Sequence, residues 1–182
     1  DEWAHSAEKL LGALNAELPA DLAARKARIV DEKFHPRFDA LSRTYIYRVI
    51  CDPIRNPLME RFAWRVNAAL DENALKRSAE IFLGAHDFAA FGSPTSERGT
   101  TARKVTNSEW GKKPNGAWQY KVRADAFLYR MVRRLVYVQV AAAQGRCSVK
   151  EIQLALKGRG KLPAGLAPAR GLTLTKIEYP DA

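Results

Sequence analysis

The stretch 126–136 places Arg130, Arg133 and Arg134 inside an otherwise apolar run. Its pattern is typical of a strand end that leads into a helix, and it predicts a helix that begins near Leu128. A guanidinium group beside a hydrophobic face costs free energy unless it meets an anion. That anion is either a carboxylate or a phosphate, and the rest of the sequence is needed to distinguish the two.

The charge balance favours a polyanionic partner. The 182 residues include 30 Lys and Arg against 20 Asp and Glu, which gives a net charge of +10. A merely solubilising positive surface is the alternative, and net charge alone does not exclude it.

Two distant cysteines, Cys51 and Cys147, favour free thiols in a reducing compartment. No Cys/His spacing resembles a metal site, and no apolar run approaches the ~20 residues of a membrane span. We therefore expect a soluble cytoplasmic protein without metal.

Hydrophobic periodicity and turn residues predict mixed helices and strands without a regular βαβα rhythm. This order favours an α+β fold with an antiparallel sheet flanked by helices. The predicted elements are a helix over 3–14, a short strand over 28–35, a strand over 44–50, a helix capped by Asp71 and ended by Gly84, strands over 105–110 and 117–122 joined by a turn at 113–116, the helix near Leu128, a helix over 148–156 and a strand over 172–179. Polar loops are expected over 52–57 and 93–101.

Five segments occur in an order that spans almost the whole chain. They lie at 14–21, 34–47, 84–91, 127–133 and 167–172, and they include Phe-Leu-Tyr-Arg-Met-Val-Arg and Ala-Pro-Ala-Arg-Gly-Leu. Together they resemble the tRNA pseudouridine synthase A family. The resemblance implies the pseudouridine synthase fold and an isomerase that converts uridine to pseudouridine in the anticodon stem-loop of tRNA, just 3′ of the anticodon. It also implies a homodimer that uses no cofactor and no metal.

The family's catalytic aspartate lies in an Arg-Thr-Asp-Ala-Gly type of motif upstream of these segments, and this chain does not contain that motif. Asp125, in Arg-Ala-Asp-Ala, lacks the Thr and the Gly, and we interpret it as a strand-end residue. We expect residues 1–40 to be the end of the aspartate-bearing N-terminal half and residues 41–182 to be the C-terminal half. The chain would then begin inside a longer gene product and would be inactive alone. The alternative is a non-catalytic RNA-binding module with the same fold.

The resemblance gives Arg133 and Tyr45 their expected roles. Arg133 would pair with the missing aspartate and keep it ionised, as the chemistry requires of a nucleophile or base. A structural ion pair with another acid is the alternative. Tyr45 would stack on the flipped uracil and assist proton transfer through its hydroxyl. Its alternative is a core residue of the sheet, which is what we expect of Tyr47.

Further cations are expected to meet RNA phosphates. Each of them is as readily explained alone as a solvated surface charge, but as a set they fit a positive surface for folded RNA. The set is Arg37, Arg43, Arg103, Lys104, Arg130 and Arg134.

His86 and Asp87 have no accompanying nucleophile motif, so a structural role is expected for both. Tyr137 and Ala143 stand where the family usually has glycine, so helix packing or dimer contacts are expected to differ there.

Overall fold

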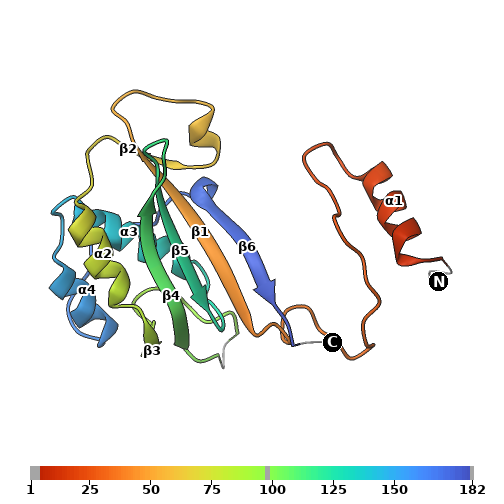
Figure 1. Cartoon of the computed structure of the whole chain (residues 1–182). Helices are drawn as coiled ribbons and strands as arrows, with labels where there is room; N and C mark the ends of the chain where they lie inside the picture. Colours follow the sequence, from red (N-terminus) through yellow and green to blue (C-terminus); the bar gives the residue numbers. More distant parts are fainter. Residues whose placement is uncertain (1–4, 97–98, 181–182) are drawn as a thin grey trace. The chain divides into compact units, whose positions relative to one another are not determined.

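The structure, a computed structural model, describes residues 5–96 and 99–180 (Figure 1). Its internal contacts divide the chain into a small unit that ends at Asp39 and a larger unit, Ala40–Pro180.

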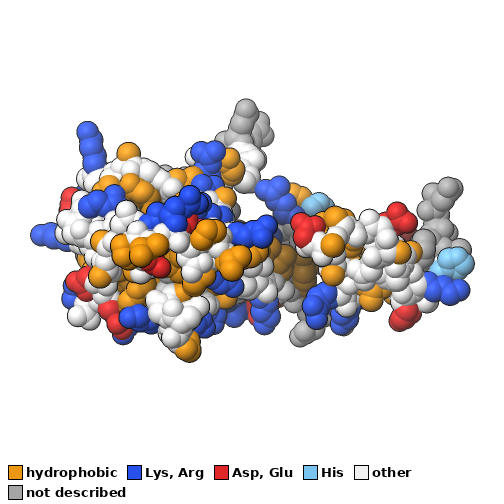
Figure 2. Space-filling view, turned by 90° about the horizontal axis from the view of Figure 1, so that it is seen from above, with side chains coloured by type: hydrophobic (Ala, Val, Ile, Leu, Met, Phe, Trp, Pro, Cys, Tyr) orange, Lys and Arg blue, Asp and Glu red, His pale blue; other side chains and the backbone are white. Residues whose placement is uncertain are grey.

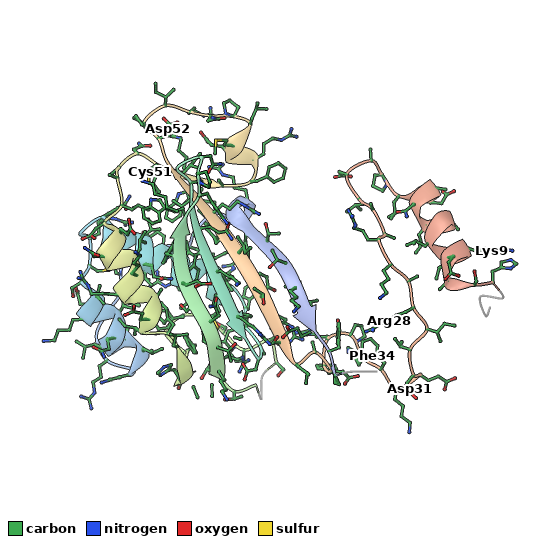
Figure 3. All side chains as sticks on the ribbon, in the orientation of Figure 1. Lys9, Arg28, Asp31, Phe34, Cys51 and Asp52 are labelled. Carbon is green, nitrogen blue, oxygen red and sulfur yellow. The ribbon has the colours of Figure 1, made fainter. Side chains whose placement is uncertain are left out.

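The small unit contains one regular element, α1 (Ala7–Glu17), within its described residues. The helix predicted over 3–14 therefore starts and ends later, and Trp3 lies outside the described residues. The strand predicted over 28–35 is wrong, because the described chain pairs no strand with it and Asp31 closes a turn instead. The Asp31 carboxylate accepts the Lys33 N–H at 2.8 Å. Figure 3 marks Asp31 on this irregular segment.

The larger unit is built on a six-stranded sheet in the order β2-β1-β5-β4-β3, with β6 also paired to β1. The strands are β1 (Ser42–Cys51), β2 (Trp64–Val66), β3 (Gly84–Asp87), β4 (Ala102–Lys112), β5 (Trp118–Ala124) and β6 (Leu172–Glu178). One edge of β1 pairs with β5, and its other edge is divided between β6 and β2. Only the β1–β2 pair is parallel among the described pairs, so the predicted α+β fold with a mainly antiparallel sheet is confirmed.

Period-two alternation separates the two faces of this sheet. In β5 the residues Trp118, Tyr120 and Val122 are buried, whereas Lys121 lies exposed on the opposite face. Helices α2 (Glu72–Glu80), α3 (Met131–Ala143) and α4 (Val149–Leu156) cover the apolar face (Figure 1). Tyr47 is fully buried in this core, as expected, and so are Phe88 and Phe91.

Local signals explain where most elements begin and end. The Asp71 carboxylate accepts the N–H groups of Asn73 and Ala74 at the start of α2, and Ser148 caps α4 in a capping box with Glu151. The predicted turn joins β4 to β5, where the Lys113 N–H donates to the Ala117 carbonyl at 2.8 Å.

Two boundaries differ from the prediction. Gly84 does not end α2 but begins β3, at φ 100°. Helix α3 begins at Met131 rather than near Leu128, because Arg130 before it adopts φ 62°, a left-handed conformation that cannot continue an α-helix. The loop over 93–101 is irregular in its described residues except for one β-bridge from Ser93 to Tyr129, and 97–98 lie outside them.

Candidate functional site

Arg133, in the first turn of α3, fastens the segment that leads into β6. Its Nε donates to the Ala167 carbonyl at 2.6 Å, and the Ala167 N–H donates to the backbone carbonyl of Arg133 at 3.3 Å. The Tyr47 hydroxyl donates to the next carbonyl, that of Pro168, at 2.6 Å. Burial raises the pKa of Tyr47 well above its usual range, against the opposing positive charges of Arg133 and Arg170. Tyr47 therefore stays a neutral donor, and Arg133 is held in one place by the backbone.

No acid pairs with Arg133 in the described part of the chain. Each ion pair found within residues 5–96 and 99–180 has a Lys or an Arg other than Arg133 as its cation. The structural alternative for Arg133, an ion pair with some other acid, therefore has no partner among these residues. A half-buried guanidinium that uses one nitrogen to hold the backbone keeps its two terminal nitrogens for an anion.

Tyr45 lies two residues before Tyr47 in β1 and shares its face of the sheet. It is partly buried, and its backbone is paired with Val122 of β5 and Leu174 of β6. The Phe127 ring meets the Tyr45 ring edge-on, with centroids 5.1 Å apart and planes at 87°. This contact fixes the orientation of the Tyr45 ring at the rim of the core.

Arg134 holds a second part of the segment before β6. Its Nη1 donates to the carbonyls of Pro163 at 2.6 Å and Gly165 at 2.8 Å, and burial lowers the pKa of the guanidinium. Gly165 has φ 140°, and a Cβ placed on it would overlap the Tyr137 ring. That ring in turn stacks on Trp64 with centroids 6.2 Å apart. Residues 163–168 are therefore fixed by two adjacent arginines of α3.

Arg130 differs from the other two arginines because its side chain is exposed. Its guanidinium carbon lies 4.8 Å from the centre of the Tyr129 ring. Beside it is a hollow of about 380 Å³, here called the Arg130 pocket. The pocket is lined by Ala89, Ala90, Phe91, Gly92, Ser93, Tyr129, Arg130, Arg134, Gly165 and Leu166. Arg130 and Arg134 thus line the same pocket. The sequence pattern alone did not establish this.

The remaining predicted cations lie elsewhere. Arg43 donates to the Asp125 carbonyl at 2.9 Å, and the Lys104 N–H donates to the Asp125 carboxylate at 3.0 Å, so both meet at the end of β5. Arg103 donates through Nη1 to the Thr100 carbonyl at 2.8 Å. Arg37 is exposed in the small unit. Asp125 thus follows β5 as a capping acid, as expected.

A larger hollow of about 630 Å³ lies on the helix-free face of the sheet. Its lining is Thr44, Thr106, Asn107, Lys121, Arg123, Thr175, Lys176 and Glu178. Glu178 pairs with Arg123 and with Lys176, and the hydrogen bond from Lys176, followed by that from Ser42, lowers the pKa of Glu178 to about 2. The alternation of Gln119, Lys121 and Arg123 in β5 is the sequence signal for this polar face.

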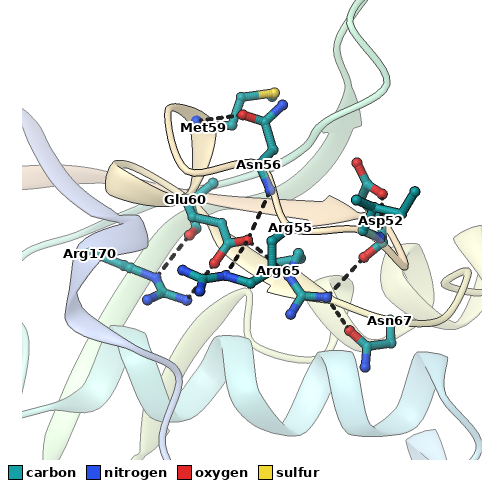
Figure 4. Close-up of polar contacts among 10 residues, drawn as sticks. Asp52, Arg55, Asn56, Met59, Glu60, Arg65, Asn67 and Arg170 are labelled. Atoms are coloured by element: carbon teal, nitrogen blue, oxygen red, sulfur yellow. Dashed lines mark hydrogen bonds and ion pairs between the residues drawn. The ribbon is translucent and has the colours of Figure 1, made fainter.

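A buried carboxylate, Glu60, was not anticipated from the sequence. It lies in η1 (Met59–Arg61), 2.9 Å from Arg65 and 3.7 Å from Arg170 of η2 (Ala169–Gly171) (Figure 4). Arg170 also donates to the Ala63 carbonyl at 3.2 Å. This cluster ties the β1–β2 connection, which follows Cys51 and Asp52 (Figure 3), to the segment that Arg133 holds.

The described side chains form no group suited to a metal ion. Within residues 5–96 and 99–180, no three His, Cys, Asp or Glu side chains come together as metal ligands would. Among the helices described, none has the length and apolar character needed to span a bilayer.

Comparison with known proteins gives one consistent family. A family model for tRNA pseudouridine synthase matches residues 78–180. The chain is 36% identical to tRNA pseudouridine synthase A of Geobacter sp. strain M21 over 92% of its own length and 68% of that protein. It is 33% identical to tRNA pseudouridine synthase A 2 of Clostridium tetani, covering 94% and 69%. With the synthase A of Methylacidiphilum infernorum it shares 37% identity, covering 95% and 68%.

Proposed function

The chain belongs to the tRNA pseudouridine synthase family, and from this premise we propose that it forms part of an enzyme that isomerises uridine in the anticodon stem-loop of tRNA. In this proposal residues 1–40 end the N-terminal half and residues 41–182 form the C-terminal half. The proposal places the enzyme in the cytoplasm, where it needs no cofactor. The observation that carries it is Arg133, which is held by the Ala167 carbonyl and has no acidic partner among the described residues.

Arg133 would meet the catalytic aspartate of the segment that precedes this chain in the family. A guanidinium within a few ångströms of a half-buried carboxylate lowers its pKa and fixes its direction. The aspartate is then ionised when it attacks the sugar or the base, or removes a proton. Because the backbone already positions Arg133, little rearrangement is needed when the aspartate arrives.

Tyr45 would hold the uracil once it has left the helical stack. Its ring is already oriented by Phe127 at 5.1 Å, and an aromatic platform offsets part of the lost stacking of a flipped base. Its hydroxyl would assist proton transfer.

The RNA surface in this proposal is electrostatic. Figure 2 shows Lys and Arg side chains spread over the visible face of the larger unit, where Asp and Glu are fewer. Arg130 and Arg134 at the Arg130 pocket are the first proposed phosphate contacts, with Arg37, Arg43, Arg103 and Lys104 as further candidates.

Replacing both Arg130 and Arg134 with Ala should weaken binding of the anticodon stem-loop and make it less sensitive to salt. The slope of log K against log salt should fall by about 1 for each phosphate that the variant no longer neutralises. Fluorescence anisotropy over a salt series measures this slope. The matched control is Arg77→Ala with Arg159→Ala, which removes the same charge from exposed positions on α2 and after α4. Identical slopes for the two double variants would remove Arg130 and Arg134 from the RNA surface.

The net charge of +10 also fits a second candidate, an RNA-binding module without chemistry. It predicts the same salt dependence and no turnover, even after an aspartate-bearing segment is added.

We further propose that the protein self-associates, because the family acts as a homodimer. Tyr137 stands where the family usually has glycine. It is partly buried, and its ring contacts Trp64 and lies against Gly165 of the same chain. Light scattering at micromolar concentration should give about twice the chain mass of 20.4 kDa. A purely monomeric mass would contradict self-association.

A further inference from the structure

Tyr129 presents a large aromatic side chain to solvent on a fixed backbone. The residue is 56% exposed, while its neighbour Leu128 is 4% exposed. The Tyr129 N–H donates to the Ser93 carbonyl at 2.8 Å, and Gly92 packs so closely that a Cβ there would lie 2.9 Å from the Tyr129 carbonyl. The ring is therefore exposed at a rigid point of the chain rather than on a free loop. An exposed aromatic ring leaves apolar area in water, which marks it as a contact surface.

A guanidinium group lies over this ring. The Arg130 guanidinium carbon is 4.8 Å from the ring centre, and the left-handed backbone at Arg130 sets the direction of that side chain. Tyr129 and Arg130 both line the Arg130 pocket, and Arg134 lines it as well. The lining contains two arginines and no acid.

We infer that Tyr129 and Arg130 bind one unpaired nucleotide of the substrate RNA, a nucleotide other than the one that is modified. This inference rests on the proposed function. The base stacks on the Tyr129–Arg130 pair, since bases stack on aromatic rings and on guanidinium planes. The phosphate of this nucleotide faces Arg130 and Arg134 in the pocket.

The nucleotide is unpaired because both faces of a paired base are covered by its neighbours in the helix. A paired stem offers phosphates to Arg130 but no free base to Tyr129. The pair therefore selects loops over stems, and this separates stacking from the general electrostatic attraction of a basic protein.

The test uses the 182-residue chain with Tyr129→Ala and Tyr129→Phe. Dissociation constants for an anticodon stem-loop and for an RNA duplex of equal length are measured by fluorescence anisotropy across a salt series. Tyr129→Ala should weaken stem-loop binding about tenfold, the size expected for one lost base stack, without changing the salt slope. Tyr129→Phe should bind as the wild type does, and duplex binding should be equal in all three proteins. Phe62→Ala, which removes another exposed ring from the same unit, should leave stem-loop binding unchanged.

Thermal unfolding of each variant verifies the fold, because Tyr129, at 56% exposure, is still partly buried. If Tyr129→Ala binds the stem-loop as tightly as the wild type, or loses the same factor on the duplex, the stacking site is wrong while the RNA-modifying function stands. If the wild-type chain binds neither RNA, both the stacking site and the proposed RNA surface of this chain are wrong.

Discussion

The 182-residue chain alone is expected to make no pseudouridine from an anticodon stem-loop, even at enzyme excess over RNA. No residue of the sequence stands in the family's aspartate motif. The nearest decoy, Asp125, is committed to the backbone, because its Oδ1 accepts the N–H of Lys104 at 3.0 Å and that of Ala126 at 2.6 Å. Covalent or general-base chemistry needs a carboxylate that reaches the reacting nucleotide. The measurement is a single-turnover pseudouridine assay.

The positive control is the same chain extended at its N-terminus by the aspartate-bearing segment of the Geobacter relative. This extended protein should convert the uridine, and its aspartate-to-alanine variant should not. If the unextended chain makes pseudouridine, its catalytic group has been wrongly assigned. If the extended protein binds the RNA and stays inactive, the RNA-binding module is the better description.

In the extended protein, Arg133→Ala should lower the single-turnover rate about 10²- to 10³-fold, the usual loss when one preorganised electrostatic interaction with the reacting group is removed. The dissociation constant for the RNA should change much less, because the proposed partner of Arg133 is the aspartate rather than a phosphate. Removing an interaction with the reacting group slows mainly the chemical step. Separate binding and single-turnover measurements give the two numbers.

Arg134→Ala is the matched control for Arg133→Ala. Both arginines donate to backbone carbonyls of residues 163–168, so both variants lose the same kind of structural bond. Only Arg133 is expected to reach the aspartate, so only Arg133→Ala should reduce the rate at saturating RNA. Equal rate losses would assign the effect to the position of residues 163–168 instead.

Tyr45→Phe in the same assay keeps the aromatic ring and removes the hydroxyl. A large loss of rate would assign proton transfer to the Tyr45 hydroxyl, and a small loss would leave stacking on the uracil as the role of Tyr45.

The sequence predicted the elements whose ends are set by local chemistry. Asp71 and Ser148 cap their helices through hydrogen bonds within three residues, and the turn at 113–116 closes its own hairpin. Strands β2 and β3 were missed because they have three and four residues and exist only through pairing with β1 and β4. Residues 28–35 show the converse error, since Ile29 and Val30 favour a strand but no described strand pairs with them.

The candidate site, too, was predicted only in part from the sequence. The family motif singled out Arg133, which the helical periodicity alone did not distinguish from Arg134. Sequence could not show that both hold carbonyls about thirty residues further along the chain, because such hydrogen bonds depend on how α3 lies against the segment before β6. The Glu60 cluster was out of reach for the same reason, since Arg170 is distant from Glu60 in sequence.

Arg130 is the one non-glycine residue with positive φ in the described chain. An L-residue in this conformation costs about 1–2 kcal/mol, and glycine would relieve most of that cost. Yet glycine would also remove the cation over Tyr129 and at the pocket. Stability and positive charge are therefore opposed at this position. A redesign that selects for stability alone would replace the side chain that the RNA is proposed to contact.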